Sequence, residues 1–115
     1  MRTILFTLAL CGGATAAAAD LSLSLPLGAL DSVSGQTYAC EGGESFTVQY
    51  VNSGANSLAI LPIDGETRIF VNVVSGSGAR YASGADIWWS KGDTATLENE
   101  MTEGSLQNCE AQEAQ

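Results

Sequence analysis

Apolar and polar positions alternate along short stretches of the chain, and Gly, Asn and Asp residues separate these stretches. In residues 45–50, apolar Phe46, Val48 and Tyr50 alternate with polar side chains. This period of two is typical of a strand with one buried face. The 3.6-residue period of an amphipathic helix does not run long enough to predict one. The pattern therefore predicts an all-β fold, with further strands over residues 58–63, 68–74, 79–82, 87–91 and 95–98.

Turn residues mark where the expected strands end. Asp64 and Gly65 follow the strand over residues 58–63, and both residue types tolerate the positive φ of a two-residue type I′ hairpin turn. In the strand that follows, Ile69, Val71 and Val73 share one face. Strands that recur about every ten residues are typical of a β-barrel or a β-sandwich.

The first 19 residues have the pattern of a secretory signal peptide. Arg2 supplies a positive charge, residues 4–11 are almost entirely apolar, and Ala16 to Ala19 offer small residues for cleavage. The apolar run is shorter than the roughly 20 residues that span a bilayer. Cys11 follows the bulky Leu10, whereas a lipoprotein attachment site has Gly or Ala there. We therefore expect a cleaved signal, an exported protein and no stable membrane anchor.

The two ends of the exported chain are less regular. Residues 20–37 place a leucine at every second position from Leu21 to Leu27, which predicts an extended strand or an arm ahead of the main domain. Residues 111–115 form a polar tail, and we expect the chain to fray after Cys109.

Composition narrows the possible chemistry. The 115 residues include 13 acidic and four basic side chains, for a net charge of −9, and no histidine. Catalytic sites that need histidine and His-ligated metals are thereby excluded, and we expect no metal and no cofactor. The charge disfavours nucleic acid and anionic membranes, and it favours a cationic partner.

Two cysteines remain after the expected signal peptide. An even pair in an exported chain predicts a disulfide, here between Cys40 and Cys109. Closing a loop of roughly 70 residues contributes about 4 kcal/mol in the chain-entropy model. A metal-binding or redox-active pair is disfavoured, because the two thiols are far apart in the sequence and no histidine accompanies them.

Two motifs make the sequence similar to a known family. Residues 74–81 read Val-Ser-Gly-Ser-Gly-Ala-Arg-Tyr, and residues 87–93 read Ile-Trp-Trp-Ser-Lys-Gly-Asp. In order and spacing they resemble the signature of the C-type lysozyme inhibitors. The resemblance extends from about Tyr38 to Cys109, and the expected inhibitor domain is residues 38–110. It implies an antiparallel β-barrel of about eight short strands closed by one disulfide. It also implies a protein that is not an enzyme and whose partner is a basic C-type lysozyme. Many members of the family carry a lipoprotein cysteine that this sequence lacks, so we expect the soluble periplasmic form.

The resemblance also implies a binding site. Ser77, on a loop, and Lys91 would enter the lysozyme cleft, where a hydroxyl and an ammonium can bond to the two catalytic carboxyl groups. The glycine at 78 would let the backbone approach the cleft floor closely. The expected contact set is Ser77, Gly78, Ala79, Arg80, Tyr81 and Lys91.

Other interpretations of these residues stay open at this point. Ser77 and Lys91 can be an ordinary turn serine and a solvated hairpin lysine, and Arg80 can pair with Asp86 or Asp93. Strand alternation predicts that Tyr81 and one residue of the Trp88-Trp89 pair are core. A glycan-binding module that stacks a sugar on the other tryptophan is the main alternative function. An enzyme using Asp86 and Asp93 as paired carboxylates is a third.

Overall fold

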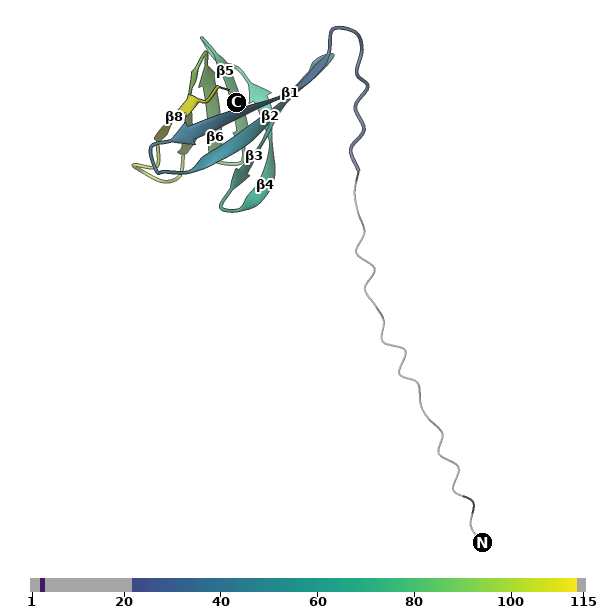
Figure 1. The fold of residues 1–115 in the computed structure, drawn as a ribbon, viewed down its shortest axis with the longest axis horizontal. Coiled ribbons are helices and arrows are strands. Elements are labelled where there is room, and N and C mark those ends of the chain that lie inside the picture. Colours follow the sequence, from purple (N-terminus) through teal and green to yellow (C-terminus); the bar gives the residue numbers. More distant parts are fainter. Residues whose placement is uncertain (1–2, 4–21, 114–115) are drawn as a thin grey trace.

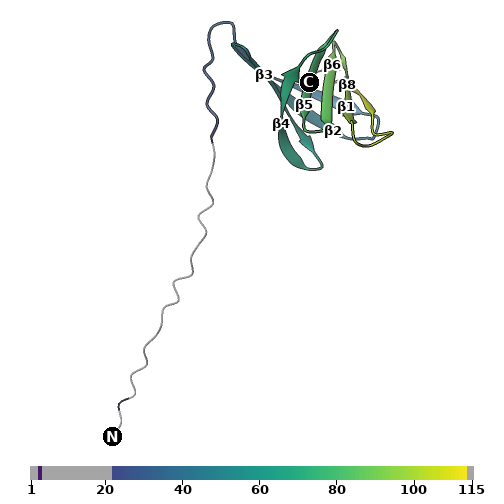
Figure 2. The same cartoon turned by 180° about the vertical axis from the view of Figure 1, so that it is seen from behind.

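Eight antiparallel strands make up the described part of the chain, which comprises residue 3 and residues 22–113 of a computed structural model (Figure 1). Each strand pairs with the next one along the chain, and β8 pairs with β1 to close the barrel (Figures 1 and 2). The all-β prediction and the closed barrel are confirmed. The strands are β1 (Ser32–Cys40), β2 (Ser45–Ser53), β3 (Asn56–Ile63), β4 (Glu66–Val73), β5 (Ala79–Ser83), β6 (Asp86–Lys91), β7 (Thr94–Asn99) and β8 (Gln107–Ala111).

The expected signal peptide and Cys11 lie outside the described residues, apart from Thr3. Across the described ranges, no helix has both the length and the apolar character needed to cross a membrane.

A tight hairpin joins β3 to β4 at the place that the sequence predicts. Asp64 has φ +51° and Gly65 has φ +79°. Positive φ at both central positions is the requirement of a type I′ turn, whose twist matches that of the flanking strands. On one side of the turn, Pro62 pairs with Thr67 of β4. The ladder between β2 and β3 runs only from Gln49 to Ser53 of β2, so Pro62 lies beyond its end, where a missing N–H costs no ladder bond.

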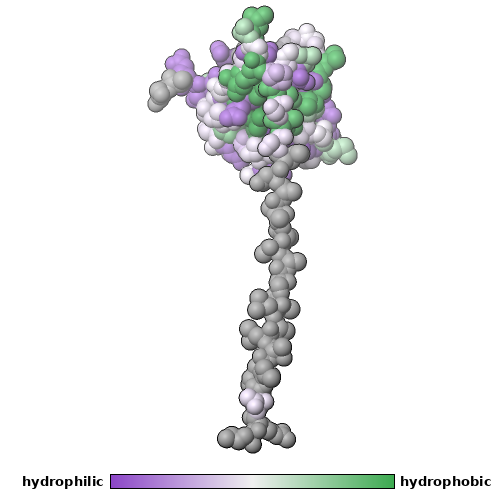
Figure 3. Space-filling view, turned by 90° about the vertical axis from the view of Figure 1, so that its right-hand side faces the viewer, coloured by the Kyte–Doolittle hydropathy of each residue, from purple (hydrophilic) through white to green (hydrophobic). Residues whose placement is uncertain are grey.

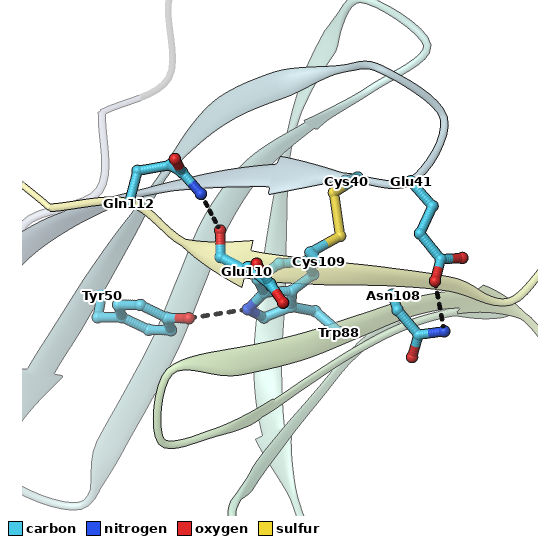
Figure 4. The surroundings of a disulfide bond; sticks show 8 residues. All are labelled: Cys40, Glu41, Tyr50, Trp88, Asn108, Cys109, Glu110 and Gln112. Carbon is cyan, nitrogen blue, oxygen red and sulfur yellow. Dashed lines mark hydrogen bonds between the residues drawn. A yellow bond between two sulfur atoms is a disulfide. The ribbon is translucent and has the colours of Figure 1, made fainter.

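An aromatic cluster fills the barrel. The Trp88 side chain is fully buried, and the rings of Tyr38 and Phe46 meet it edge-on at centroid distances of 4.9 and 5.6 Å. Edge-to-face contacts of this kind add about 0.5–1.5 kcal/mol each beyond the area they bury. The Trp88 indole N–H donates to the Tyr50 hydroxyl at 2.9 Å (Figure 4). The Tyr38 and Tyr50 hydroxyls are 2.7 Å apart. The buried polar groups of these rings therefore satisfy one another.

The disulfide lies where the barrel closes. Cys40 in β1 and Cys109 in β8 are directly paired across the strands and joined by a bond (Figure 4). Strand pairing continues beyond it, since Ala111 pairs with Tyr38 and the Gln112 N–H donates to the Thr37 carbonyl at 2.8 Å. The prediction that the chain frays after Cys109 is therefore wrong. Closure of the barrel needs these last residues as a strand, although their sequence is polar.

The boundary between arm and barrel also differs from the prediction. The strand β1 begins at Ser32, so residues 32–37 belong to the barrel and not to the arm. Ahead of it, Asp31 accepts hydrogen bonds from the backbone N–H groups of Gly28 and Gly54, which lower the pKa of its carboxyl group. The Ser53 hydroxyl donates to the Pro26 carbonyl. These bonds tie the end of the arm to the β2–β3 turn.

In β4, the predicted apolar face is the outer one. Ile69 and Val71 are each 50% exposed, and between them Phe70 is fully buried. Their outward neighbours on adjacent strands are also apolar, since Ile60 pairs with Ile69 and Leu58 pairs with Val71. The side of the barrel with β3 and β4 faces the viewer in Figure 3, where apolar surface is visible.

Candidate functional site

The two motifs meet at one end of the barrel. Residues 74–78 connect β4 to β5, and Lys91 is the last residue of β6, just before the β6–β7 turn. In a barrel whose strands run alternately up and down, these two connections lie at the same end. Ser77 and Lys91 are both exposed there.

Gly78, the last residue of the loop before β5, packs the loop against β6. Its φ is +65°, a backbone conformation that costs an L-residue about 1–2 kcal/mol. A Cβ at this position would collide with the Ser90 carbonyl oxygen and would lie 2.6 Å from Lys91 Cγ. The loop therefore packs directly against the backbone that carries Lys91. Inside the loop, the Ser75 hydroxyl donates to the Gly78 carbonyl at 3.2 Å.

Trp89 links the two parts of the site. Its indole N–H donates to the Ser77 carbonyl at 2.8 Å, and Lys91 Nζ lies 4.2 Å from the centre of its ring. Lys91 follows Trp89 by two residues on the same outer face of β6. The structure thus brings Ser77 and Lys91 together through a shared contact with one aromatic ring.

Arg80 lies beside this group with a different partner from those predicted. It is directly opposite Trp89 in the β5–β6 ladder, and its Cζ lies 5.7 Å from the Trp89 ring centre. Its guanidinium pairs with Glu100 at 2.9 Å. Asp86 instead pairs with Arg68 at 2.5 Å. The register of the strands, and not the distance along the sequence, decides these pairs.

Two members of the expected contact set belong to the barrel wall. Tyr81 is 5% exposed, and burial raises the pKa of its phenol. It is therefore a core residue, as strand alternation predicts, and its contact with a partner stays a prediction that its burial makes less favourable. Ala79 starts β5 and packs against the core. The exposed residues of the set are Ser77, Gly78 and Lys91, with Arg80 half-buried behind them.

The carboxylates are concentrated at the other end of the barrel. The β1–β2, β3–β4, β5–β6 and β7–β8 connections meet there, and the acidic residues in or next to them are Glu41, Glu44, Asp64, Glu66, Asp86, Glu98, Glu100 and Glu103. The end that carries Ser77 and Lys91 has fewer carboxylates. Asp93 lies there, in the β6–β7 turn that follows Lys91, on a molecule whose net charge is strongly negative.

The geometry bears on the two alternative functions. Asp86 begins β6 and Asp93 follows it, so at about 3.3 Å per residue they lie roughly 20 Å apart, too far to act as a glycosidase pair. Of the two tryptophans, Trp88 is in the core, and Trp89 has the Lys91 and Arg80 side chains over its ring. It is not a free platform for a sugar. In the described ranges, no three His, Cys, Asp or Glu residues are grouped to hold a metal ion.

The sequence of the barrel matches a known family. The sequence model of the family described as "Membrane-bound lysozyme-inhibitor of c-type lysozyme" matches residues 38–105, which include the loop, Trp89 and Lys91. The chain belongs to this family.

Two relatives carry the name membrane-bound lysozyme inhibitor of C-type lysozyme. The protein from Pseudomonas aeruginosa is 59% identical over 61 residues, covering 52% of this chain and 48% of that protein. The protein from Cupriavidus necator is 44% identical over 78 residues, covering 64% of this chain and 62% of that protein. The chain thus matches about half to three fifths of the length of these relatives.

A solved structure of the family matches a larger share of the chain than these relatives do. It is the crystal structure of Pseudomonas aeruginosa MliC in complex with hen egg white lysozyme. The two folds superpose with a TM-score of 0.69 and 44% sequence identity, covering 83% of this chain and 98% of the other. The barrel architecture of this family member is therefore shared with a protein that was crystallised on a lysozyme.

Proposed function

We propose that this protein inhibits C-type lysozyme by placing the Ser77 loop and the Lys91 side chain in the active-site cleft of the enzyme. The observation that carries the proposal is the convergence of these two residues at one barrel end, where both contact Trp89. The names of the two relatives and the lysozyme complex of Pseudomonas aeruginosa MliC support the same partner.

The chemistry of the two residues suits this target. Lysozyme works with a protonated glutamic acid and an ionised aspartate on either side of the bond it cleaves. The Ser77 hydroxyl can donate to one carboxyl group and accept from the other, so it fits both protonation states. The Lys91 ammonium supplies a charge-assisted bond to the ionised carboxylate. A narrow loop with glycine at 76 and 78 can reach the floor of a cleft without bulky side chains.

The overall charge supports a basic lysozyme as the partner. A strongly acidic molecule is attracted over a distance to a basic one, which raises the association rate and weakens with salt. The acidic far end of the barrel would lie away from the cleft, so its carboxylates would not be buried against those of the enzyme.

We also propose a location and a biological role. The chain is exported by its N-terminal signal and acts in the periplasm, where it protects peptidoglycan from hydrolysis without catalysing a reaction itself. The relatives are named as membrane-bound. For this chain we propose the soluble form, because Leu10 occupies the position before Cys11 where a lipoprotein attachment site has Gly or Ala.

The proposal is tested by the lysis of a bacterial cell-wall suspension by a C-type lysozyme. The purified, oxidised protein should stop lysis at a near-stoichiometric amount, and Ser77→Ala and Lys91→Ala should each raise the inhibition constant about tenfold or more, because each removes a bond to a charged or catalytic carboxyl group. Ser45→Ala, an exposed serine at the far end of the barrel, is the control and should inhibit like wild type.

Two results would contradict the proposal. Uninhibited lysis at a tenfold excess of wild-type protein and low salt would remove lysozyme as the partner. Full inhibition by both loop-end variants would show that other residues form the contact.

A further inference from the structure

Trp89 lies on the outer face of the barrel and is not part of the core. Trp88 next to it points inward and is fully buried, and Trp89 is not a member of the buried cluster. Its ring is half-buried by three neighbours from three different segments: the Ser77 carbonyl at 2.8 Å from Nε1, Lys91 Nζ at 4.2 Å from the ring centre, and Arg80 Cζ at 5.7 Å. A large aromatic residue is thus used to contact polar and charged groups at the candidate site.

We propose that Trp89 is the positioning residue of this site, holding the Ser77 loop through its indole N–H and the Lys91 ammonium through its ring before the partner binds. The proposal deepens the proposed function and rests on it for the identity of the partner. Its structural half, the order of the loop and of Lys91 in the free protein, is independent of that function.

The contacts support a preorganised unit. The loop of residues 74–78 belongs to no strand, and its described ties to the barrel are the Trp89–Ser77 bond and the close packing of Gly78 on β6. The indole N–H is a donor without an acceptor function, so it fixes the Ser77 carbonyl in one direction. That leaves the Ser77 hydroxyl free to face outward.

Lys91 gains order from the same ring. A lysine side chain has four rotatable bonds, and fixing it when a complex forms costs affinity. An ammonium over an indole ring is held by the attraction of the positive charge to the π face. Arg80 opposite Trp89 is held in turn by Glu100 at 2.9 Å, so a row of Glu100, Arg80, Trp89 and Lys91 crosses the outer surface toward the loop end.

Trp89→Phe is the informative variant, because phenylalanine keeps an aromatic face for Lys91 and removes the N–H that holds Ser77. We expect ¹⁵N relaxation of the free variant to show increased mobility at residues 76–78, with the thermal midpoint within a few degrees of wild type. The inhibition constant should rise about tenfold, and combining Trp89→Phe with Ser77→Ala should cost less than the sum of the two single effects.

Trp89→Leu also removes the aromatic face. It should raise the inhibition constant further, and its penalty should be reduced when it is combined with Lys91→Ala. Glu100→Gln serves as the control, since it breaks the Arg80–Glu100 ion pair at its more exposed partner and leaves the indole N–H and its Ser77 bond in place. It should leave the loop as ordered as in wild type.

The outcomes separate the inference from the function on which it rests. If wild-type protein fails to inhibit lysozyme, the function is wrong, and loop mobility in Trp89→Phe still tests the structural half. If wild type inhibits and Trp89→Phe keeps a rigid loop, Trp89 is not the positioning residue. Additive effects in the Trp89→Phe and Ser77→Ala double variant would also overturn the inference, because they would mean that the two residues act separately.

Discussion

Replacing Gly78 with alanine tests the packing of the loop on β6. The substitution adds one methyl group at a residue whose φ is +65°, and that methyl would meet the Ser90 carbonyl oxygen and lie 2.6 Å from Lys91 Cγ. The left-handed backbone costs alanine about 1–2 kcal/mol. Overpacking against a fixed backbone atom costs a further 1–3 kcal/mol, roughly. The total strain is therefore about 2–5 kcal/mol, comparable with a large part of the stability of a small domain.

This strain can either lower the stability of the fold or displace the loop, and both effects can be measured. If the loop stays in place, urea unfolding of the oxidised protein should show a free energy of unfolding lower by about 3 kcal/mol. If the loop shifts away from β6, stability is recovered and the inhibition constant rises instead, because Ser77 no longer sits beside Lys91. We expect Gly78→Ala to lower either the stability or the inhibition of lysozyme, or both. A lysozyme inhibition assay run beside the unfolding curve shows which of them changes.

Gly76→Ala is the matched control. Nothing lies within 4 Å of a Cβ at Gly76, and its φ is not in the left-handed region. Its stability should stay within about 0.5 kcal/mol of wild type. Gly78→Ala with wild-type stability and wild-type inhibition would refute the argument, since it would mean that the loop does not pack against β6 as described.

Three further predictions concern the barrel and its charge. Replacing Cys40 and Cys109 together with serine should lower the unfolding free energy by about 4 kcal/mol, and equal urea midpoints with and without the bond would contradict this. Burial raises the pKa of Tyr38 and of Tyr81, so both phenols stay neutral in the folded protein above their ordinary pKa of about 10. The stability they contribute is complete below pH 10 and is lost as the pH rises toward their folded pKa values. The free energy of unfolding should then fall by up to about 1.4 kcal/mol per pH unit for each tyrosine, and Tyr38→Phe should flatten the slope. Raising the salt concentration from about 0.05 to about 0.5 M shortens the Debye length, which should slow association with a basic lysozyme and leave dissociation nearly unchanged. Association rates in stopped-flow measurements that do not depend on salt would argue against electrostatic steering.

The sequence predicted those parts of the fold that depend on local pattern. The alternation of Phe46, Val48 and Tyr50 identified β2, and the Asp64-Gly65 pair identified a hairpin turn with positive φ at both residues. Both are consequences of short-range sterics and burial, which a stretch of six to ten residues contains in full.

Long-range pairing explains what the sequence did not reveal. The start of β1 at Ser32 and the end of β8 at Ala111 are polar stretches that become strands because their partners across the barrel are in place. In β4, alternation showed that Ile69 and Val71 share a face, but not which one. The barrel interior takes the larger Phe70, and the β-branched residues, which favour strands on either face, lie outside.

The candidate site followed a similar division. Family resemblance located Ser77 and Lys91, and strand alternation placed Tyr81 in the core and one tryptophan outside. The Trp89–Ser77 hydrogen bond and the Arg80–Glu100 ion pair depend on how β5, β6 and the β7–β8 loop pack against one another, so no sequence motif predicts them. The nearest signal in the sequence was the Trp-Trp pair itself, because adjacent strand residues point to opposite faces.

The most direct test of the central claim is a titration of lysozyme with this protein in the presence of an oligosaccharide substrate analogue that fills the enzyme's cleft. If Ser77 and Lys91 occupy the cleft, the analogue and this protein compete for one site. Once the analogue's concentration exceeds its own dissociation constant for lysozyme, the apparent dissociation constant of this protein should rise in proportion to that concentration. An apparent dissociation constant that does not change at saturating analogue would show that the protein binds lysozyme outside the cleft, and the proposed mode of inhibition would be wrong.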